Sequence, residues 1–444
     1  MSQLSRSLLV SLYLLLCILL GGSGQGVWRN LALQLLGIAL IAWATLFPAR
    51  PEDPNDRPVF LYLLGAFAAL IVVLQLIPLP AGIWPSLPGR QALAEGLVLL
   101  EGQLPSLPIS LAPYRSVMAL LAIIPGLALF IAVKMLRPSP AWLAGAMVLG
   151  LSASIIVGAV QVASGSETWA YLYPFTNSGA VGLFANRNHM GTLLLVSTPF
   201  AAALLVSTRS DRRGSRQGKL AVGIAALVLV VIGIVLNGSL AVLALALPVM
   251  VASAALLPAA VRWRRFALPV AALGVLAAIG VLASNPVGGP AAPGEDGSIQ
   301  SRMQIWATTA QAIRDTMPVG TGLGTFSQVY RQYEDPLAVT PEYVNHAHND
   351  FLELVLELGL GGIVLIALFI CWWIVAAAKV WTSPLSTPYG RAATIASAVI
   401  LAHSLVDFPL RTSAISAIFG VAIALIAQRL RSTPTQSTRH VKLG

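Results

Sequence analysis

Apolar runs of about twenty residues recur along the whole chain and are separated by polar segments. An apolar helix of about twenty residues can cross the hydrocarbon core of a bilayer. The runs therefore predict an all-α, polytopic membrane protein with about twelve transmembrane helices, of which the first starts near the N-terminus rather than forming a cleaved signal peptide. The expected helices are 7–21, 31–48, 59–77, 116–134, 141–163, 181–207, 219–236, 239–259, 266–283, 352–376, 392–410 and 412–428.

The composition agrees with this pattern. Of the 444 residues, 57% are hydrophobic and only 10% are charged, and the mean hydropathy is +0.81. A soluble domain carries about 25% charged residues. We therefore expect one integral membrane domain over residues 1–444. The two cysteines, Cys17 and Cys371, lie in apolar runs and predict neither a disulfide framework nor a metal site.

The distribution of basic residues predicts the topology. With the N-terminus in the cytoplasm, 19 of the 27 Lys and Arg residues fall on the cytoplasmic side, as the positive-inside rule requires. An even number of helices then places the C-terminus in the cytoplasm as well. This bias explains the net charge of +10 without a nucleic-acid partner.

Two long segments are expected on the outer side. Residues 78–115 contain many prolines around an amphipathic stretch, Gln91 to Leu104, which we expect to lie in the membrane interface. Residues 284–351, before the tenth helix, open with a Gly/Pro/Ala-rich run and continue into helix-like sequence from Ser301 to Asp315.

Ionisable residues in or beside spanning helices are costly and are therefore candidates for function. The first group comprises Asn186, Arg187, Asn188 and His189, at the outer start of the sixth helix. Arg187 suits either of two roles: an anchor at the helix end, or a cation that holds a phosphate through bidentate hydrogen bonds.

The second group extends from Arg302 to Glu357. Arg302 starts an amphipathic helix, and Gly320, Gly322 and Gly324 predict a compact turn. No strand precedes these glycines and their spacing differs from the dinucleotide-binding fingerprint.

Within this group, His346, His348, Asn349 and Asp350 stand where the tenth helix enters the membrane. The spacing of the histidines and the absence of a nearby third ligand argue against a metal site, so we expect no metal or other cofactor. A single histidine that acts as a general base suits the pattern better. The alternative is structural, with Asn349 or Asp350 capping the helix.

The third group is His403, Asp407 and Arg411, which steps of four would place on one face of the eleventh helix. An aspartate next to a histidine can orient a catalytic base, and Arg411 could bind an anion. A buried polar network that holds helices together remains the alternative.

Several motifs resemble the O-antigen ligase-related family, which covers O-antigen ligases, Wzy-type polymerases and protein glycan ligases. They are GLFANRNHMG, R-x-x-I-W followed by PVGTGLGTF, HAHNDFLELVLELGLGG, LPISLAPYRSVMALL and HSLVDFPLR. The resemblance spans most of the chain.

The resemblance implies a metal-independent, inverting glycosyltransferase of the GT-C type in the bacterial inner membrane, with its active site on the periplasmic face. The implied donor is a glycan on undecaprenyl diphosphate, and the implied acceptor is lipid A-core or another glycan. On the matching positions, His348 would be the base and Arg302 would bind the diphosphate. A lipid donor also explains why the enzyme is embedded among membrane lipids.

One departure concerns a family arginine in Ser-Arg-Gly, for which this chain has Ser239-Leu240-Ala241. We expect Arg187 to replace it.

A lipid-linked glycan transporter or flippase is the main alternative function. Transporters place substrates near the midplane of the membrane, whereas these candidate residues gather at one face. A noncatalytic scaffold would leave Arg302 and His348 unexplained. The motifs do not separate ligase from polymerase.

Overall fold

The computed structural model describes residues 2–24, 28–49, 58–165, 169–173, 176, 179–207, 213–257, 299–337 and 344–428. Their regular structure is helical, apart from β1 (Pro78–Leu79) paired antiparallel with β2 (Leu107–Pro108). Seven helical segments of this part are long and apolar enough to cross a membrane. The prediction of an all-α polytopic membrane protein is therefore confirmed.

Six of these segments belong to the first half of the chain. They are α1 (Gln3–Leu20), α2 (Trp28–Leu46), α3 (Val59–Leu76), α5 with α6 (Pro113–Ala122 and Ile124–Leu136), α7 (Pro140–Ser164) and α8 (Arg187–Ser207). Between α3 and α5 lie the short turn η2 (Trp84–Ser86) and α4 (Gln91–Glu101).

The second half contributes α15 (Leu360–Thr382) as the seventh such segment. The other helices are α9 (Arg213–Asn237), α10 (Leu240–Ala254), α12 (Ile299–Thr316), α13 (Phe326–Tyr333), α14 (Asp350–Leu358), α16 (Pro388–His403), η5 (Pro409–Arg411) and α17 (Ser413–Ile426). Each predicted range in the described part overlaps a helix. The helix predicted at 266–283 lies outside the described residues, so the total of twelve and the sidedness of the termini stay predictions.

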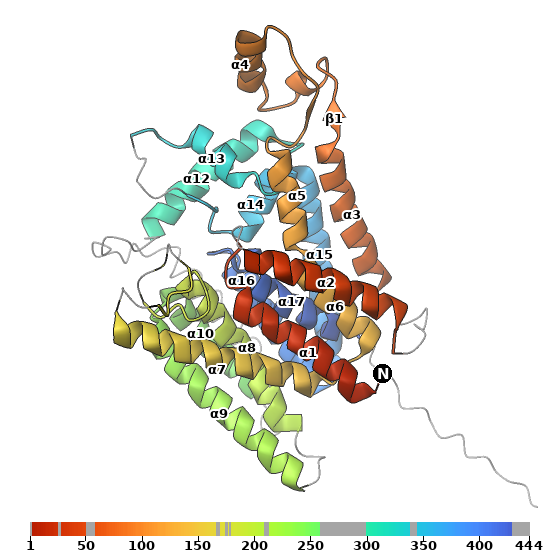
Figure 1. Ribbon diagram of the computed structural model, residues 1–444, viewed down its shortest axis with the longest axis vertical. Helices are drawn as coiled ribbons and strands as arrows, with labels where there is room; N and C mark the ends of the chain where they lie inside the picture. The colour runs from red at the N-terminus through yellow and green to blue at the C-terminus, as the bar shows by residue number, and fades with distance from the viewer. Residues whose placement is uncertain are drawn as a thin grey trace, which may run out of the picture.

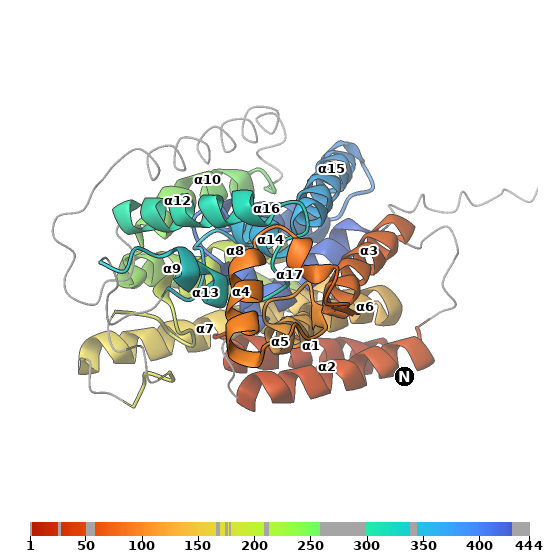
Figure 2. The same ribbon diagram turned by 90° about the horizontal axis from the view of Figure 1, so that it is seen from above.

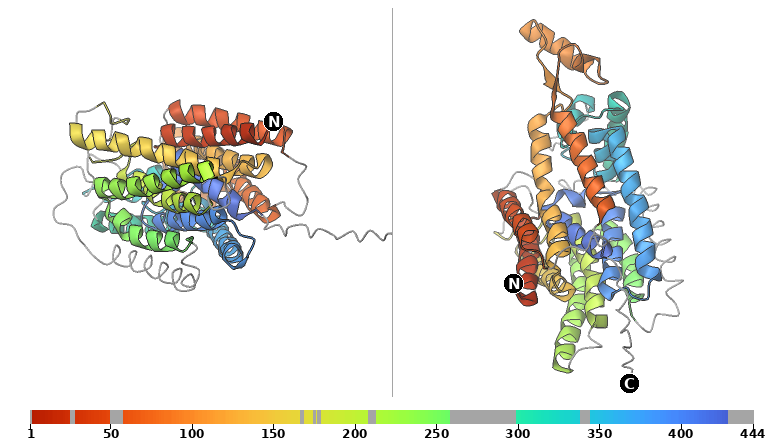
Figure 3. Two further views of the ribbon diagram at one scale, coloured as in Figure 1. Left: turned by 90° about the horizontal axis from the view of Figure 1, so that it is seen from below. Right: turned by 90° about the vertical axis from the view of Figure 1, so that its right-hand side faces the viewer.

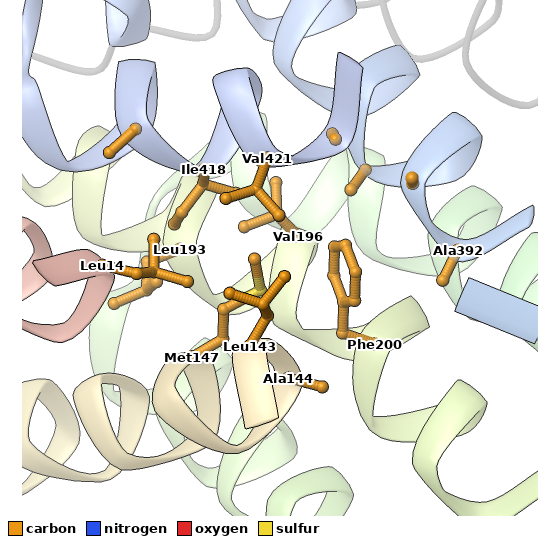
Figure 4. Close-up of a cluster of buried hydrophobic side chains, with 14 of the residues drawn as sticks. Leu14, Leu143, Ala144, Met147, Leu193, Val196, Phe200, Ala392, Ile418 and Val421 are labelled. Carbon is orange, nitrogen blue, oxygen red and sulfur yellow. The ribbon is translucent and has the colours of Figure 1, made fainter. Parts of the chain in front are cut away.

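The core of the bundle surrounds α8, whose apolar stretch is 83% buried, against 11% for α3 and α15. Figure 4 shows Leu193, Val196 and Phe200 of α8 among side chains from α1, α7, α16 and α17. The low burial of α3 and α15 leaves their apolar side chains to contact lipid, where an apolar surface is favourable.

Small residues let the backbones of α6 and α17 come into direct contact. A Cβ placed on Gly420 would lie 2.1 Å from the carbonyl oxygen of Gly126, so only glycine fits there. Such contacts are a common means of packing helices in membranes, where burying apolar surface gives little driving force. Because α17 leads directly from η5, this packing also fixes the position of the connection that carries Asp407.

A cap of shorter helices covers one end of the bundle. Figure 1 shows α4, α12, α13 and α14 at that end, and Figure 2 views them from above. The right-hand view of Figure 3 places the N-terminus, where α1 starts, away from α4, the orange helix at the top. Ile305, Phe326 and Leu356 belong to a small apolar cluster that joins α12, α13 and α14. We call this the capped end.

The proline-rich segment is tied to the cap through a buried arginine. Arg90 is 1% exposed and donates hydrogen bonds to the carbonyl oxygens of Ile109 and Gly320. Burial lowers the pKa of Arg90 to about 10. The turn predicted from three glycines is confirmed, since Gly320, Gly322 and Gly324 all have positive φ angles. Whether α4 lies in the membrane interface stays a prediction.

Candidate functional site

The third polar group is not one face of a helix, and that prediction was wrong. The helix α16 ends at His403, and Asp407 and Arg411 lie in the connection to α17. Pro409 provides the physical reason, because a proline disfavours helical geometry at the preceding residue and removes a helix hydrogen bond. The turn brings Asp407 into the capped end.

Asp407 is the centre of the candidate site. Its side chain is 0% exposed and meets residues from three other parts of the chain. The Nδ2 of Asn188 donates a hydrogen bond to Oδ2. The Oδ1 lies 3.7 Å from His189 Nε2 and 3.5 Å from His348 Nδ1, and Oδ2 lies 3.8 Å from Arg302 Nη2.

These contacts keep the carboxylate ionised. Burial by itself raises the pKa of Asp407, because a charge loses its hydration. The contacts with His189 and His348 and the charge of Arg302 outweigh burial and hold that pKa well below its usual range. Asp407 can therefore hold a permanent negative charge opposite the histidine rings.

The backbone of His348 is held in a demanding conformation. Its φ of 49° lies in the left-handed region, which few non-glycine residues adopt. The preceding residue is fixed from both sides: Trp306 Nε1 of α12 donates to the Ala347 carbonyl oxygen (2.9 Å), and the Ala347 amide donates to Glu353 Oε2 (2.9 Å). Residues held in this way are frequent at functional sites.

A ring of aromatic contacts surrounds Phe408. The centroids of His189, His346 and His348 lie 4.9, 4.2 and 5.0 Å from the centroid of its ring. Phe408 therefore fixes the distance between histidines that come from α8 and from the segment before α14. Nothing in the sequence singled out Phe408, although it stands inside the HSLVDFPLR motif.

The first polar group forms an amide network at the start of α8. The backbone amide of Asn188 donates to Asn186 Oδ1 (2.8 Å), and Ser239 Oγ donates to Asn188 Oδ1 (2.7 Å). Asn188 in turn donates to Asp407. Ser239, from the stretch that departs from the family pattern, thus supports the site indirectly. Leu240 is 55% exposed, and Arg187 is half-buried beside Asn188.

His403 takes a separate place. It is fully buried, and its Nδ1 lies 2.7 Å from Thr192 Oγ1 of α8. This contact joins α16 to α8 below Asp407, which agrees with the structural alternative for this residue.

The two histidines before α14 face different carboxylates. His346 Nδ1 lies 2.9 Å from Glu353 Oε1, whereas His348 faces Asp407. Asn349 caps α14, since its Oδ1 accepts from the Leu352 amide at 3.0 Å. The capping alternative is thereby confirmed for Asn349.

Arg411 is surrounded by three carboxylates of α14. Its Nη2 lies 3.1 Å from Glu357 Oε2 and 3.3 Å from Glu353 Oε1, and its Nε lies 3.6 Å from Asp350 Oδ1. We call these four side chains the Arg411 cluster. Glu353 and Glu357 stand four residues apart in LELVLEL, a spacing that could have marked them as a buried ionisable pair.

The pKa values of the cluster follow from its crowding. Burial raises the pKa of Asp350 to about 6, against the opposing charge of Arg411 and the hydrogen bond from Ser404. For Glu353, the charges of Arg411 and His346 outweigh burial and hold the pKa below its usual range. With three carboxylates around one guanidinium, the cluster accepts a proton at mildly acidic pH.

We expect the contribution of Asp350 to stability to rise as the pH falls from 7 to 5. The folded protein takes up a proton at Asp350 over this range, whereas the unfolded chain does so only near the ordinary value of 3.8. More protons are then bound in the folded state, which adds about 1 kcal/mol to the free energy of unfolding. Thermal unfolding of the unmodified protein and of Asp350→Asn, in detergent at both pH values, measures this contribution.

The Asp350→Asn variant should remove that part of the pH dependence, because the amide oxygen can still accept from Ser404 and from the Leu410 amide. Asp315→Asn, on an exposed position of α12, is the matched control. An unchanged pH dependence in Asp350→Asn would show that Asp350 does not take up a proton in this range.

Among the described residues, no three His, Cys, Asp or Glu side chains are grouped as a metal would require. The groups that face Asp407 are instead the guanidinium of Arg302 and the imidazole rings of His189 and His348. Such an arrangement can hold an anionic group and can move a proton between a histidine and a bound hydroxyl.

No curated protein is similar enough to the chain to count as a match. A family described as O-Antigen ligase matches residues 225–367, a range that contains Arg302, His346, His348 and the α14 carboxylates. This match supports the resemblance to the O-antigen ligase-related family that the motifs indicate.

Proposed function

We propose that the protein transfers a glycan from undecaprenyl diphosphate to a sugar hydroxyl at the periplasmic face of the bacterial inner membrane. The acceptor is lipid A-core, as for an O-antigen ligase, or another glycan chain, as for a polysaccharide polymerase. The family match supports glycan transfer of this general type. The donor, the acceptor, the GT-C assignment and an inverting, metal-independent reaction are parts of the proposal.

The observation that carries the proposal is the placement of His348 beside Asp407. An ionised aspartate favours the tautomer in which Nδ1 carries the proton, so Nε2 is left as the acceptor. In the proposed step, the acceptor hydroxyl attacks C1 of the donor sugar and gives its proton to Nε2. The bond from C1 to the phosphate oxygen breaks, and its electron pair leaves with the diphosphate.

The leaving diphosphate requires fixed positive charge. Arg302 is the first candidate, because only one guanidinium nitrogen is engaged near Asp407, at 3.8 Å, and the side chain is 15% exposed. Arg187 is the second, at the start of α8 beside the amides of Asn186 and Asn188. A helix N-terminus adds a favourable dipole for an anion.

We assign the other candidate residues supporting or positioning roles. We assign the supporting role to Asn188, His189 and His403, which hold Asp407 or α8 in place. Arg411 is a positioning residue in this proposal, because its guanidinium is already engaged by three carboxylates. His346, Asn349 and Asp350 set the start of α14 and thereby the position of His348.

The test uses the purified full-length protein with an undecaprenyl-diphosphate glycan and offers lipid A-core or free glycan as separate acceptors. Product on lipid A-core identifies a ligase, and longer glycan without that product identifies a polymerase. If neither forms while the donor is moved across liposomes, the protein is a transporter and the proposal is overturned.

We expect Arg302→Ala and Arg187→Ala each to lower the transfer rate by roughly 10²–10³-fold, the usual cost of removing one group that stabilises developing charge. The rates are measured at saturating acceptor, with membrane insertion and thermal stability checked for each variant. Arg314→Ala, later in α12, is the matched control. Full activity of Arg187→Ala would remove Arg187 from the site and leave Arg302 to bind the diphosphate alone.

A further inference from the structure

At the end of the bundle opposite the cap, the structure contains a cavity of about 480 Å³. It lies where α15 and α17 end and α3 begins, and so is separate from the Asp407 site. Its lining includes Pro58, Trp372, Ala376, Lys379, Ser383 and Gln428. The walls toward α15 are apolar and the rim is polar, which is the arrangement of a site for an amphipathic molecule.

The cation of this cavity is Lys379, in the last turn of α15. Its side chain is exposed, and no carboxylate of the described chain pairs with it. Lys134 of α6 reaches the same place, because its Nζ donates to the carbonyl oxygen of Ala427, which also lines the cavity. Arg391 lies beside the cavity, because its Nη2 donates to the carbonyl oxygen of the lining residue Ser383 at 3.4 Å.

Among the described residues, negative charge is concentrated at the other end of the bundle. Every carboxylate in the described part of the chain belongs to α4, to the segment from α12 to α14, or to the connection that carries Asp407. The cavity therefore combines the exposed ammonium group of Lys379 with apolar walls that face the bilayer. A free anion would use only the cations, whereas a lipid headgroup with its first methylene groups uses both features.

We propose that this cavity binds the headgroup of an anionic phospholipid. The phosphate lies against Lys379, and the acyl chains extend along the exposed side of α15, where Trp372 and Val375 form the wall. Basic pockets between transmembrane helices on the cytoplasmic side are suited to such headgroups. With the predicted topology, the lipid comes from the inner leaflet, so this site is distinct from that of the lipid-linked donor.

The test is native mass spectrometry of the full-length protein released from nanodiscs of phosphatidylglycerol or phosphatidylcholine. We expect tighter retention of phosphatidylglycerol and about fivefold weaker retention in Lys379→Gln, since one basic group near the surface contributes about 1 kcal/mol. Ala376→Phe should fill the cavity and weaken retention without any change of charge. Arg6→Gln, on α1 and outside the cavity lining, is the matched control and should retain lipid as the unmodified protein does.

Three results of this test would contradict the proposal. Equal retention of the two lipids, or retention in Lys379→Gln and Ala376→Phe equal to that in Arg6→Gln, would overturn the proposal. If lipid retention is lost in Ala376→Phe but not in Lys379→Gln, the cavity recognises only the apolar part of its ligand. That result would overturn the proposal of an anionic headgroup.

Discussion

The His348→Asn variant is expected to fold, to bind the lipid-linked donor and to transfer glycan roughly 10²–10⁴-fold more slowly, which is the usual contribution of a general base. Asparagine is the informative replacement because it tolerates the left-handed backbone that His348 adopts at φ 49°. Its amide can also donate toward Asp407. What asparagine cannot do is accept a proton from the attacking hydroxyl. The measurement is the single-turnover rate with donor bound, together with thermal stability.

His346→Asn is the matched control for this prediction. His346 lies two residues away and contacts the same Phe408 ring, but its Nδ1 is engaged by Glu353 at 2.9 Å. We expect its rate to fall much less than that of His348→Asn. A large loss in His346→Asn with an active His348→Asn would move the base to His346. Loss of stability in parallel with rate would assign His348 a structural role.

The membrane-embedded fold was predictable because its physical cause is local. A helix must satisfy its own backbone hydrogen bonds in lipid, so each spanning segment leaves an apolar run in the sequence. The ends of the helices were less predictable where a proline and a turn interrupt an apolar run. The segment 392–410 was expected to be a continuous helix, yet α16 ends at His403, since Pro409 and its neighbour cannot continue it.

The site was predictable only in part because its contacts join distant positions. Arg302 and Asp407 are 105 residues apart, and no periodic pattern connects them. Their residue types and their place near membrane ends identified them as candidates. The pairing of Arg411 with Glu353 and Glu357 was missed because those glutamates stand within an apolar stretch that reads as part of a spanning helix.

The Asp407→Asn variant should retain the bundle but lose transfer by roughly 10²–10⁴-fold, because the amide can present a donor where the carboxylate presents only acceptors. An Nδ2 that faces His348 Nδ1 favours the tautomer with a proton on Nε2, so the base is blocked. The other contacts also lose their anion: Asn188 and Arg302 would meet a neutral group.

A structural role and a catalytic role of Asp407 predict different readouts, which makes this experiment decisive. If Asp407 orients the base, kcat falls while the KM for the donor and the unfolding temperature change little. If Asp407 serves only to hold α8 against the α16–α17 connection, the unfolding temperature falls and the remaining folded fraction keeps its kcat. Asp350→Asn is the matched comparison, because Asp350 is also a buried aspartate at the capped end, 8% exposed, yet its side chain accepts from Ser404 rather than facing His348. An Asp407→Asn enzyme with the kcat of the unmodified protein would remove the aspartate from the proposed proton transfer.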